Sequence, residues 1–156
     1  MSYLNVVSLN DAKTFLRVDD TLTDDDTQIE SMIKSACRMI ENRTNHILFA
    51  RSKTYLFQDY SVYVYDYPIN QLITPSTATK CDYELYSVYE TTSSSNTSLV
   101  LNVGYQDATD VPDELKQCIL EYVKFMYYES ETNKVNYGML PIWLQEAIDY
   151  NKRFII

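Results

Sequence analysis

The spacing of apolar residues changes twice along this chain of 156 residues. Residues 29–40 carry apolar side chains at steps of three and four, which predicts one face of a long helix. Residues 47–105 instead carry short runs rich in valine and tyrosine, which are typical of strands. Helical spacing returns over residues 115–126. This order predicts an α+β fold, in which the long helix most simply packs against the sheet that follows it.

Two long amphipathic helices and two short ones are expected to form a helical core. A short helix over residues 9–17 starts from Ser8, which has an acid three residues later as in a capping box. The first long helix is expected to follow a Thr23 cap and to end within residues 42–45. The second starts at a proline step and ends near residue 128 or 129, and the last short helix is expected over residues 141–150. The two stripes are Ile29, Met32, Ile33, Ala36, Cys37 and Ile40, and Leu115, Cys118, Ile119, Tyr122, Val123 and Met126.

Strands are expected between the two long helices, in a small and mostly antiparallel sheet. Their predicted ranges are 53–57, 60–67, 83–89 and 99–103, and Pro68 closes the second. Residues 74–80 are expected to be irregular. The serine- and threonine-rich residues 91–98 are expected to form an extended polar loop, either a hairpin tip or a mobile segment.

The strand over residues 60–67 is apolar or aromatic on both faces. Val62 and Val64 point to one face and the tyrosines between them to the other. A strand with one wet face alternates apolar with polar residues, whereas tyrosine is amphipathic and enriched at protein interfaces. Two interpretations stay open: a neighbouring subunit covers this face, or the same chain covers it or leaves it exposed. The residues expected at a subunit interface are Tyr63, Tyr65, Tyr67 and Tyr86.

Charge and composition exclude several classes of function. The net charge is −9, from 13 Lys and Arg against 22 Asp and Glu, and such a surface repels nucleic acid without preventing DNA from passing nearby. The only glycines, Gly104 and Gly138, are too few for a glycine-rich phosphate loop. No apolar run approaches the roughly 20 residues that cross a bilayer, and the start has no positive n-region. The chain is therefore expected to be made in a reducing cytoplasm, with no membrane partner.

No residue pattern indicates a catalytic, metal or cofactor site. Cys37, Cys81 and Cys118 lack the C-x-x-C spacing of zinc or redox sites, and the first and third fall on apolar helix faces. The acidic residues 19–26 lack the alternation, the glycine and the closing Glu of a calcium loop. The only histidine, His46, follows a helix end, where a structural role is expected. An enzyme that uses His46 with a nearby carboxylate is the remaining catalytic alternative.

Three stretches match a known order of motifs. The first is residues 7–19, ending in Leu-Arg-Val-Asp, followed by an acidic turn and a helix to Thr44. The second is the step Tyr67-Pro68-Ile69, and the third is residues 103–105 with Val-Pro-Asp-Glu-Leu-Lys at 111–116 and a helix end at 127–131. In this order they resemble the head–tail connector (head-completion or portal adaptor) proteins of tailed bacteriophages. The match spans about residues 7–131, while residues 74–98 are longer and more polar than the pattern requires.

The resemblance implies a non-catalytic virion protein at the head–tail junction, made in the cytoplasm of a bacterial host. It implies a ring, commonly of twelve copies, that docks on the portal, completes the DNA-filled head and carries the tail or a second neck protein. Genomic DNA would pass through the lumen without specific binding. It also implies a connector-like domain over residues 1–131 and, over 132–156, a linker, a short helix and a docking tail that either extend this domain or belong to it.

The segment from Trp143 onward is the expected portal contact. Its last residues are apolar and carry two cations, a composition that a groove on a partner explains. The residues expected to dock are Trp143, Leu144, Lys152, Arg153, Phe154, Ile155 and Ile156. The alternative function is a soluble intracellular protein-binding adaptor module unrelated to virions, which an acidic surface and tyrosine-rich strands suit equally.

Overall fold

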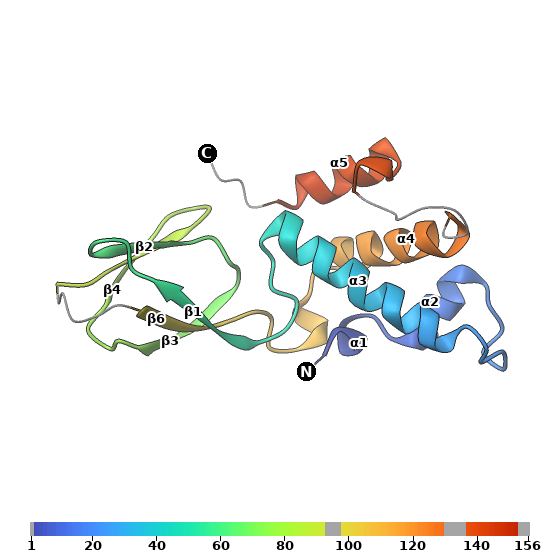
Figure 1. The fold of residues 1–156 in the computed structure, drawn as a ribbon, viewed down its shortest axis with the longest axis horizontal. Helices are drawn as coiled ribbons and strands as arrows, with labels where there is room; N and C mark the ends of the chain where they lie inside the picture. Colours follow the sequence, from blue (N-terminus) through green and yellow to red (C-terminus); the bar gives the residue numbers. More distant parts are fainter. Residues whose placement is uncertain (1, 93–97, 130–136, 153–156) are drawn as a thin grey trace.

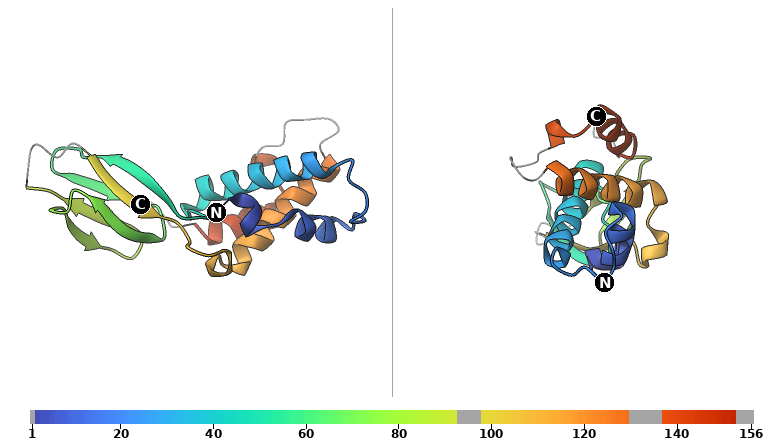
Figure 2. Two further views of the ribbon diagram at one scale, coloured as in Figure 1. Left: turned by 90° about the horizontal axis from the view of Figure 1, so that it is seen from below. Right: turned by 90° about the vertical axis from the view of Figure 1, so that its right-hand side faces the viewer.

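The computed structural model describes residues 2–92, 98–129 and 137–152. The molecule is elongated, with helices at one end and strands at the other (Figures 1 and 2). We call residues 51–103, with strands β1 to β6, the β lobe, and the helices on either side of it in sequence the helical lobe. The chain crosses between the lobes twice, after α3 and after β6.

The expected helices are present, together with a first turn that the sequence did not predict. Within the described residues the α-helices are α1 Tyr3–Val6, α2 Leu9–Leu16, α3 Asp26–Thr44, α4 Asp113–Glu129 and α5 Ile142–Tyr150, and the 3-10 turns are η1 Ala108–Asp110 and η2 Tyr137–Met139. The capping box that starts α2 is confirmed, because the Asp11 amide donates to Ser8 Oγ (3.1 Å) and the Ser8 amide to Asp11 Oδ2 (3.1 Å). The predicted Thr23 cap is wrong: α3 starts after Asp25.

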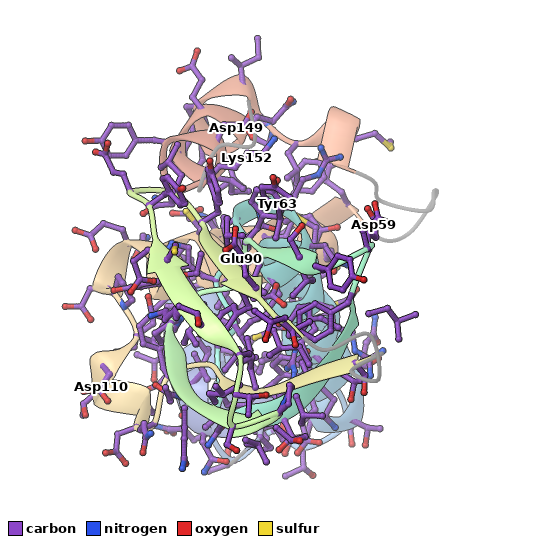
Figure 3. All side chains as sticks on the ribbon, turned by 90° about the vertical axis from the view of Figure 1, so that its left-hand side faces the viewer. Asp59, Tyr63, Glu90, Asp110, Asp149 and Lys152 are labelled. Carbon is purple, nitrogen blue, oxygen red and sulfur yellow. The ribbon has the colours of Figure 1, made fainter. Side chains whose placement is uncertain are left out.

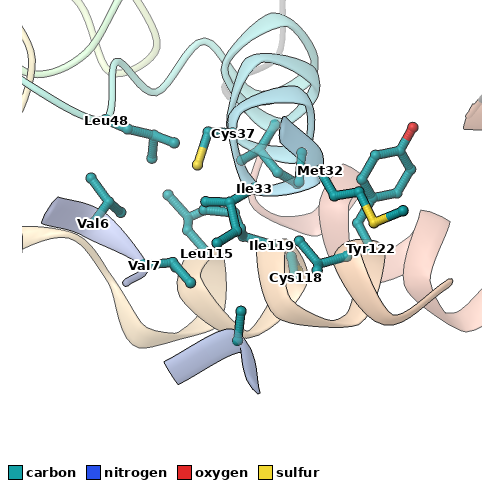
Figure 4. Packing of buried hydrophobic residues seen from close by; sticks show 14 of the residues in the cluster. Val6, Val7, Met32, Ile33, Cys37, Leu48, Leu115, Cys118, Ile119 and Tyr122 are labelled. Atoms are coloured by element: carbon teal, nitrogen blue, oxygen red, sulfur yellow. The ribbon is translucent and has the colours of Figure 1, made fainter. Parts of the chain in front are cut away.

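The prediction that the long helix lies on the sheet is also wrong. The stripe of α3 packs against the stripe of α4, while α1, α2 and α5 cover the remaining sides (Figure 4). Ile33 of α3 and Ile119 of α4 are fully buried, and burying such a side chain contributes about 1.5–3 kcal/mol. Each amphipathic helix therefore buries the apolar face of the other, so neither has to pack against the sheet.

The β lobe consists of two three-stranded antiparallel sheets whose inner faces share a separate core. The strands are β1 Arg51–Leu56, β2 Ser61–Val64, β3 Ile69–Thr74, β4 Thr79–Asp82, β5 Ser87–Glu90 and β6 Ser98–Val103, in the orders β1-β6-β3 and β2-β5-β4. The first, second and fourth expected strands are confirmed with shifted ends. The third is confirmed only over residues 87–89, which belong to β5, because residues 83–86 are the turn between β4 and β5. β3 and β4 were missed.

The polar tract over residues 91–98 connects the two sheets. It follows β5 of one sheet and leads into β6 of the other, and these two strands do not pair with each other. The expected hairpin tip is therefore wrong. Residues 93–97 lie outside the described part of the chain.

Candidate assembly surfaces

Four tyrosines form one patch on the outer face of the β lobe. Val62 and Val64 are buried, while Tyr63 between them is 55% exposed, as the alternation predicted. The ring of Tyr86 lies 5.9 Å from that of Tyr63, and it also contacts Tyr65 and Tyr83. Tyr63, Tyr65, Tyr83 and Tyr86 are called the tyrosine patch below. Tyr83 was not among the expected interface residues, because residues 83–86 were predicted to be part of a strand and are instead a turn.

Acidic residues accompany the patch. Asp59 lies in the turn that leads into β2, and Glu90 lies on β5, the strand that pairs with β2; Figure 3 shows both acids and Tyr63 on the β lobe. A partner surface for this face therefore needs to accept amphipathic rings beside negative charge.

Tyr67 does not belong to the patch, although it was grouped with it. It lies where the lobes join, 5.4 Å from the ring of His46 and 6.3 Å from that of Tyr105. His46 Nδ1 is 2.8 Å from the Tyr105 hydroxyl. Groups of the same chain thus contact Tyr67, and His46, just past the end of α3, lies against the rings of Tyr67 and Tyr105.

The junction between the lobes is held by backbone contacts among three segments. The Ile47 amide donates to Tyr67 O (2.7 Å), and the Gly104 amide donates to Pro68 O (2.8 Å). Gly104 has φ +107°, and a Cβ built on it would lie 2.3 Å from Phe49 O. Only glycine fits there, since both the backbone angle and the space exclude a side chain.

A buried acid, Glu41, reinforces this junction. Its side chain is 6% exposed and accepts hydrogen bonds from Arg51 (2.8 and 3.1 Å), from the Leu48 amide (2.9 Å) and from the Tyr3 hydroxyl (2.8 Å). Burial and the neighbouring Glu41 raise the pKa of Tyr3. Glu41 was not predicted from the sequence, although an acid on the apolar stripe with an arginine ten residues later was a usable signal.

The acidic loop before α3 is occupied by a lysine of the same chain. The ammonium of the buried Lys13 donates to Asp20 O (3.1 Å), to Leu22 O (2.6 Å) and to Asp26 Oδ1 (2.9 Å). These three bonds tie the loop to α2. In the described residues no group of three or more His, Cys, Asp or Glu could hold a metal ion.

The cysteines have the environments that the sequence indicated. Burial raises the pKa of Cys37 to about 12 and that of Cys118 to about 11, which keeps both as inert thiols. Cys81 is exposed on β4. None of the described helices combines the length and the apolar character that crossing a membrane requires.

The expected portal contact is only partly exposed. Trp143 is 54% exposed on α5 and Ile142 is more so, which makes them available to a partner. Leu144 is 1% exposed and belongs to the helical core, so its assignment to a docking surface is corrected. Lys152 is half-buried, and residues 153–156 lie outside the described part of the chain. Tyr150, 90% exposed on the same helix, was missed because it was taken only as the helix end.

A groove runs between α4 and α5 on either side of Trp143. One hollow, of about 300 Å³, is lined by Cys118 and Glu121 of α4 and by Ala147 and Tyr150 of α5. A second hollow, of about 220 Å³, continues past Trp143 toward the end of α4. These two hollows are called the α4–α5 groove below.

Known proteins match this chain in family and in fold. The family model described as phage gp6-like head-tail connector protein matches residues 6–151. A solved chain in the virion of a native gene transfer agent particle is 12% identical, with a TM-score of 0.75 over 100% of this chain and 94% of that chain. Another, from the neck of an empty gene transfer agent particle computed with C6 symmetry, is 13% identical, with a TM-score of 0.75 over 97% and 91%. No curated protein matches the chain.

The family match decides between the alternatives that the sequence left open. It covers both lobes, the junction and α5, whereas the solved chains, at 12% and 13% identity, add the likeness in fold. A match to a head–tail connector family contradicts the alternative of an adaptor unrelated to virions. The chain belongs to the phage gp6-like head–tail connector protein family, and it is a structural protein of the head–tail junction of a phage-like virion.

Proposed function

We propose that copies of this chain form a ring that docks on the portal, completes the DNA-filled head and carries the tail or a second neck protein. The observation that carries this proposal is the presence of two separate uncovered apolar surfaces, the tyrosine patch on the β lobe and the outer face of α5 on the helical lobe. A subunit in a closed ring on a portal needs at least two such contacts, one for its neighbours and one for the axial partner.

The ring contact is assigned to the tyrosine patch. Tyr63 and Tyr83 are both more than half exposed, and aromatic residues are enriched in the buried centres of interfaces. A gene transfer agent neck computed with C6 symmetry supports a ring for this fold. The resemblance implies twelve copies, which in a ring with C6 symmetry would place two copies in each of the six repeats. Native mass spectrometry of the assembled ring counts the copies.

The portal contact is assigned to α5 and the segment after it. Trp143, Ile142 and Tyr150 form an exposed apolar face, and Lys152 and Arg153 add positive charge. Trp, Tyr and Arg are the residue types that most often dominate binding energy. The α5 face and the following residues would thus supply the anchors of the portal interface.

DNA would pass through the ring without adhering. The net charge of −9 leaves few cations to displace counterions from phosphates, so an acidic lumen lets the genome slide. We also propose that the chain has no catalytic activity, an assignment supported by the contacts of His46 in the junction. A His46→Ala chain that still assembles would agree with that assignment.

Deleting residues 151–156 tests the portal contact. The truncated chain is expected to lose retention on immobilised portal protein, because it lacks the cationic and apolar anchors. An Ile73→Ser chain is the matched control, since Ile73 is a half-exposed apolar residue on the other lobe. Normal portal attachment by the truncated chain would overturn the assignment.

A further inference from the structure

The outer face of the β2-β5-β4 sheet carries negative charge beside its tyrosines. Residues that pair across strands, or that lie two apart on one strand, share a face, so Glu90 shares the face of Tyr63 through Val88 of β5. Among the residues of these three strands the only cation is Lys80, and it pairs with the inward Tyr89, which directs it to the other face. A partner for the tyrosine patch therefore has to supply the positive charge.

Two copies of the tyrosine patch do not meet this requirement. In a contact between two identical patches, Asp59 and Glu90 of one copy would meet the same acids of the other, and like charges at an interface oppose association. A two-fold contact also ends at a dimer, whereas a closed ring of more than two copies needs two different surfaces on each subunit. The surface that faces the patch in a ring is thus a different part of the same chain.

The outer face of α3 gathers exposed positive charge in the helical lobe. Lys34 and Arg38 lie four residues and therefore about one turn apart, on the side of α3 away from the stripe that packs against α4. Figure 1 shows α3 running across the front of the helical lobe, with α4 behind it. We call the exposed residues of this side the α3 face: Ser31, Lys34, Ser35, Arg38 and Asn42.

Arg38 provides positive charge that its own subunit does not neutralise. No acid among the described residues pairs with Arg38, whereas Lys34 has an exposed contact with Glu30 (3.3 Å). Arg17 is also exposed, but the acidic residues 19 and 20 follow it closely. Four other lysines are held by acids of the same chain: Lys53 by Asp66, Lys80 by Asp82, Lys116 by Asp113 and Lys124 by Glu121.

We propose that the tyrosine patch of one copy contacts the α3 face of the next copy in the ring, with Arg38 of that copy beside Glu90 and the tyrosine rings of the first. This inference rests on the proposed ring, and it names the second of the two surfaces that the ring contact joins. The contact is head-to-tail, because each copy offers its tyrosine patch to one neighbour and its α3 face to the other.

The chemistry of the two surfaces is complementary. A guanidinium binds a carboxylate through a planar pair of N–H groups and also stacks on aromatic rings, so one arginine uses both features of the patch. Arginine and tyrosine are among the residue types that are enriched at interfaces. Lys34 adds a second positive charge on the α3 face, as Asp59 adds a second negative charge beside the patch.

The two surfaces also match in length. The ring of Tyr86 is 5.6 Å from that of Tyr65 and 4.8 Å from that of Tyr83. These rings stand at the ends of three neighbouring strands, which span roughly 10 Å at about 4.8 Å per strand. The α3 face rises about 10 Å from Ser31 to Arg38 at 1.5 Å per residue. The row of three rings therefore fits along two turns of the helix.

Cys81 is a natural reporter of this contact. It is the only exposed cysteine, and it pairs with Val88 on the face of the tyrosine patch. Rings of a Ser35→Cys chain, assembled on portal protein and mildly oxidised, are expected to give a ladder of linked dimers, trimers and larger species, because Cys81 of each copy meets the new thiol of the next. Ser52→Cys, at an exposed serine on β1, is the matched control and should give no ladder.

Charge reversal tests the ion pair. Arg38→Glu and Glu90→Arg are each expected to raise the subunit concentration that ring formation needs by at least about tenfold, since each places like charges in contact. The chain with both substitutions restores opposite charges at every contact and should recover most of the loss. Arg17→Glu, at an exposed cation outside the α3 face, is the control for assembly. Thermal unfolding of the free subunits should be unchanged, because all these residues are exposed.

The outcomes separate this inference from the proposed function. A contact between two tyrosine patches would link unmodified chains in pairs through Cys81, and Ser35→Cys would add nothing. That result, or charge reversal that neither weakens nor rescues assembly, would overturn the inference, while rings counted on the portal by native mass spectrometry would leave the proposed function standing. If the unmodified chain forms no ring on the portal, the proposed function is wrong and this inference is wrong with it.

Discussion

Glu41 of α3 holds the guanidinium of Arg51 of β1 through two hydrogen bonds, of 2.8 and 3.1 Å, across the junction of the two lobes. The same carboxylate also accepts hydrogen bonds from the Leu48 amide and the Tyr3 hydroxyl. One buried acid therefore ties together α1, α3, the segment after α3 and β1. In the proposed ring, this contact would help to fix the angle at which the β lobe meets its neighbours.

Arg51→Ala is expected to lower the free energy of unfolding by about 2–3 kcal/mol. The substitution leaves a buried carboxylate without its cation, and the cost stays below the roughly 3–5 kcal/mol of a fully buried pair because Arg51 is partly exposed. Urea unfolding followed by circular dichroism measures it. Glu30→Gln, which breaks the exposed pair with Lys34, is the control and should cost at most about 0.5 kcal/mol. Equal effects of the two substitutions would contradict a special role of Glu41.

Gly104→Ala is expected to destabilise the junction by at least about 2 kcal/mol. The new Cβ would meet the backbone oxygen of Phe49, which cannot move aside as a flexible side chain could, and φ +107° is itself unfavourable for alanine. Thermal unfolding gives the comparison with Gly138→Ala, at an exposed glycine without a positive φ, which should be close to neutral. A stable Gly104→Ala chain would mean that the segments at the junction can separate.

Stability is expected to fall as the pH rises above about 10. Burial, and then the charge of Asp82, raise the pKa of Tyr89 from 10.0 to about 12. As the pH rises, the unfolded chain therefore releases the Tyr89 proton before the folded chain does. The contribution of Tyr89 to the free energy of unfolding is complete below pH 10 and is lost as the pH rises toward 12, at up to about 1.4 kcal/mol per pH unit. Unfolding in urea between pH 8 and 12 should show a shallower fall for Tyr89→Phe. An unchanged slope would show that Tyr89 is not the group that titrates.

Replacing Tyr63 and Tyr83 by serine is expected to weaken ring assembly without unfolding the subunit. Both side chains are more than half exposed, so the free energy of unfolding should change by about 0.5 kcal/mol or less for each. A loss of about 2 kcal/mol at an interface anchor corresponds to roughly 30-fold weaker association. Native mass spectrometry in the presence of portal protein measures the ring, with Ile73→Ser as the control. Full rings of the double variant would place the subunit contact elsewhere.

The helices could be predicted from the sequence because their signals are local. The stripe from Ile29 to Ile40, the Ser8–Asp11 box and the proline step before α4 each act within a few residues. What covers the stripe of α3 could not be predicted this way. Its partner α4 lies about 70 residues later, beyond the whole β lobe, and the sheet was merely the nearest apolar surface in sequence.

Two strands were missed because they carry no alternation of burial. All four residues of β4 are exposed, and β3 has register shifts between Ile69 and Gln71 and between Leu72 and Thr74 that break the period of two. The tyrosines of residues 83–86 then made a turn resemble a strand. The pairing of β6 with both β1 and β3 is non-local and leaves no pattern in any one segment.

The candidate surfaces were predictable only where a local sequence pattern sets the direction of a side chain. The alternation within β2 correctly predicted that Tyr63 faces outward. Tyr67 lies past the end of the strand, where the period of two no longer applies. Trp143 and Leu144 are adjacent on a helix and therefore face different directions, about 100° apart for 3.6 residues per turn. Grouping them by sequence assigned a core residue to the surface.

Electron cryomicroscopy of the chain mixed with the portal protein of the same virion would show whether the ring forms and which surfaces it buries. We expect a ring of copies coaxial with the portal, with α5 and the residues after it against the portal and the tyrosine patch between neighbouring copies. A chain that stays monomeric, leaves the portal bare and is absent from the neck of assembled virions would contradict it.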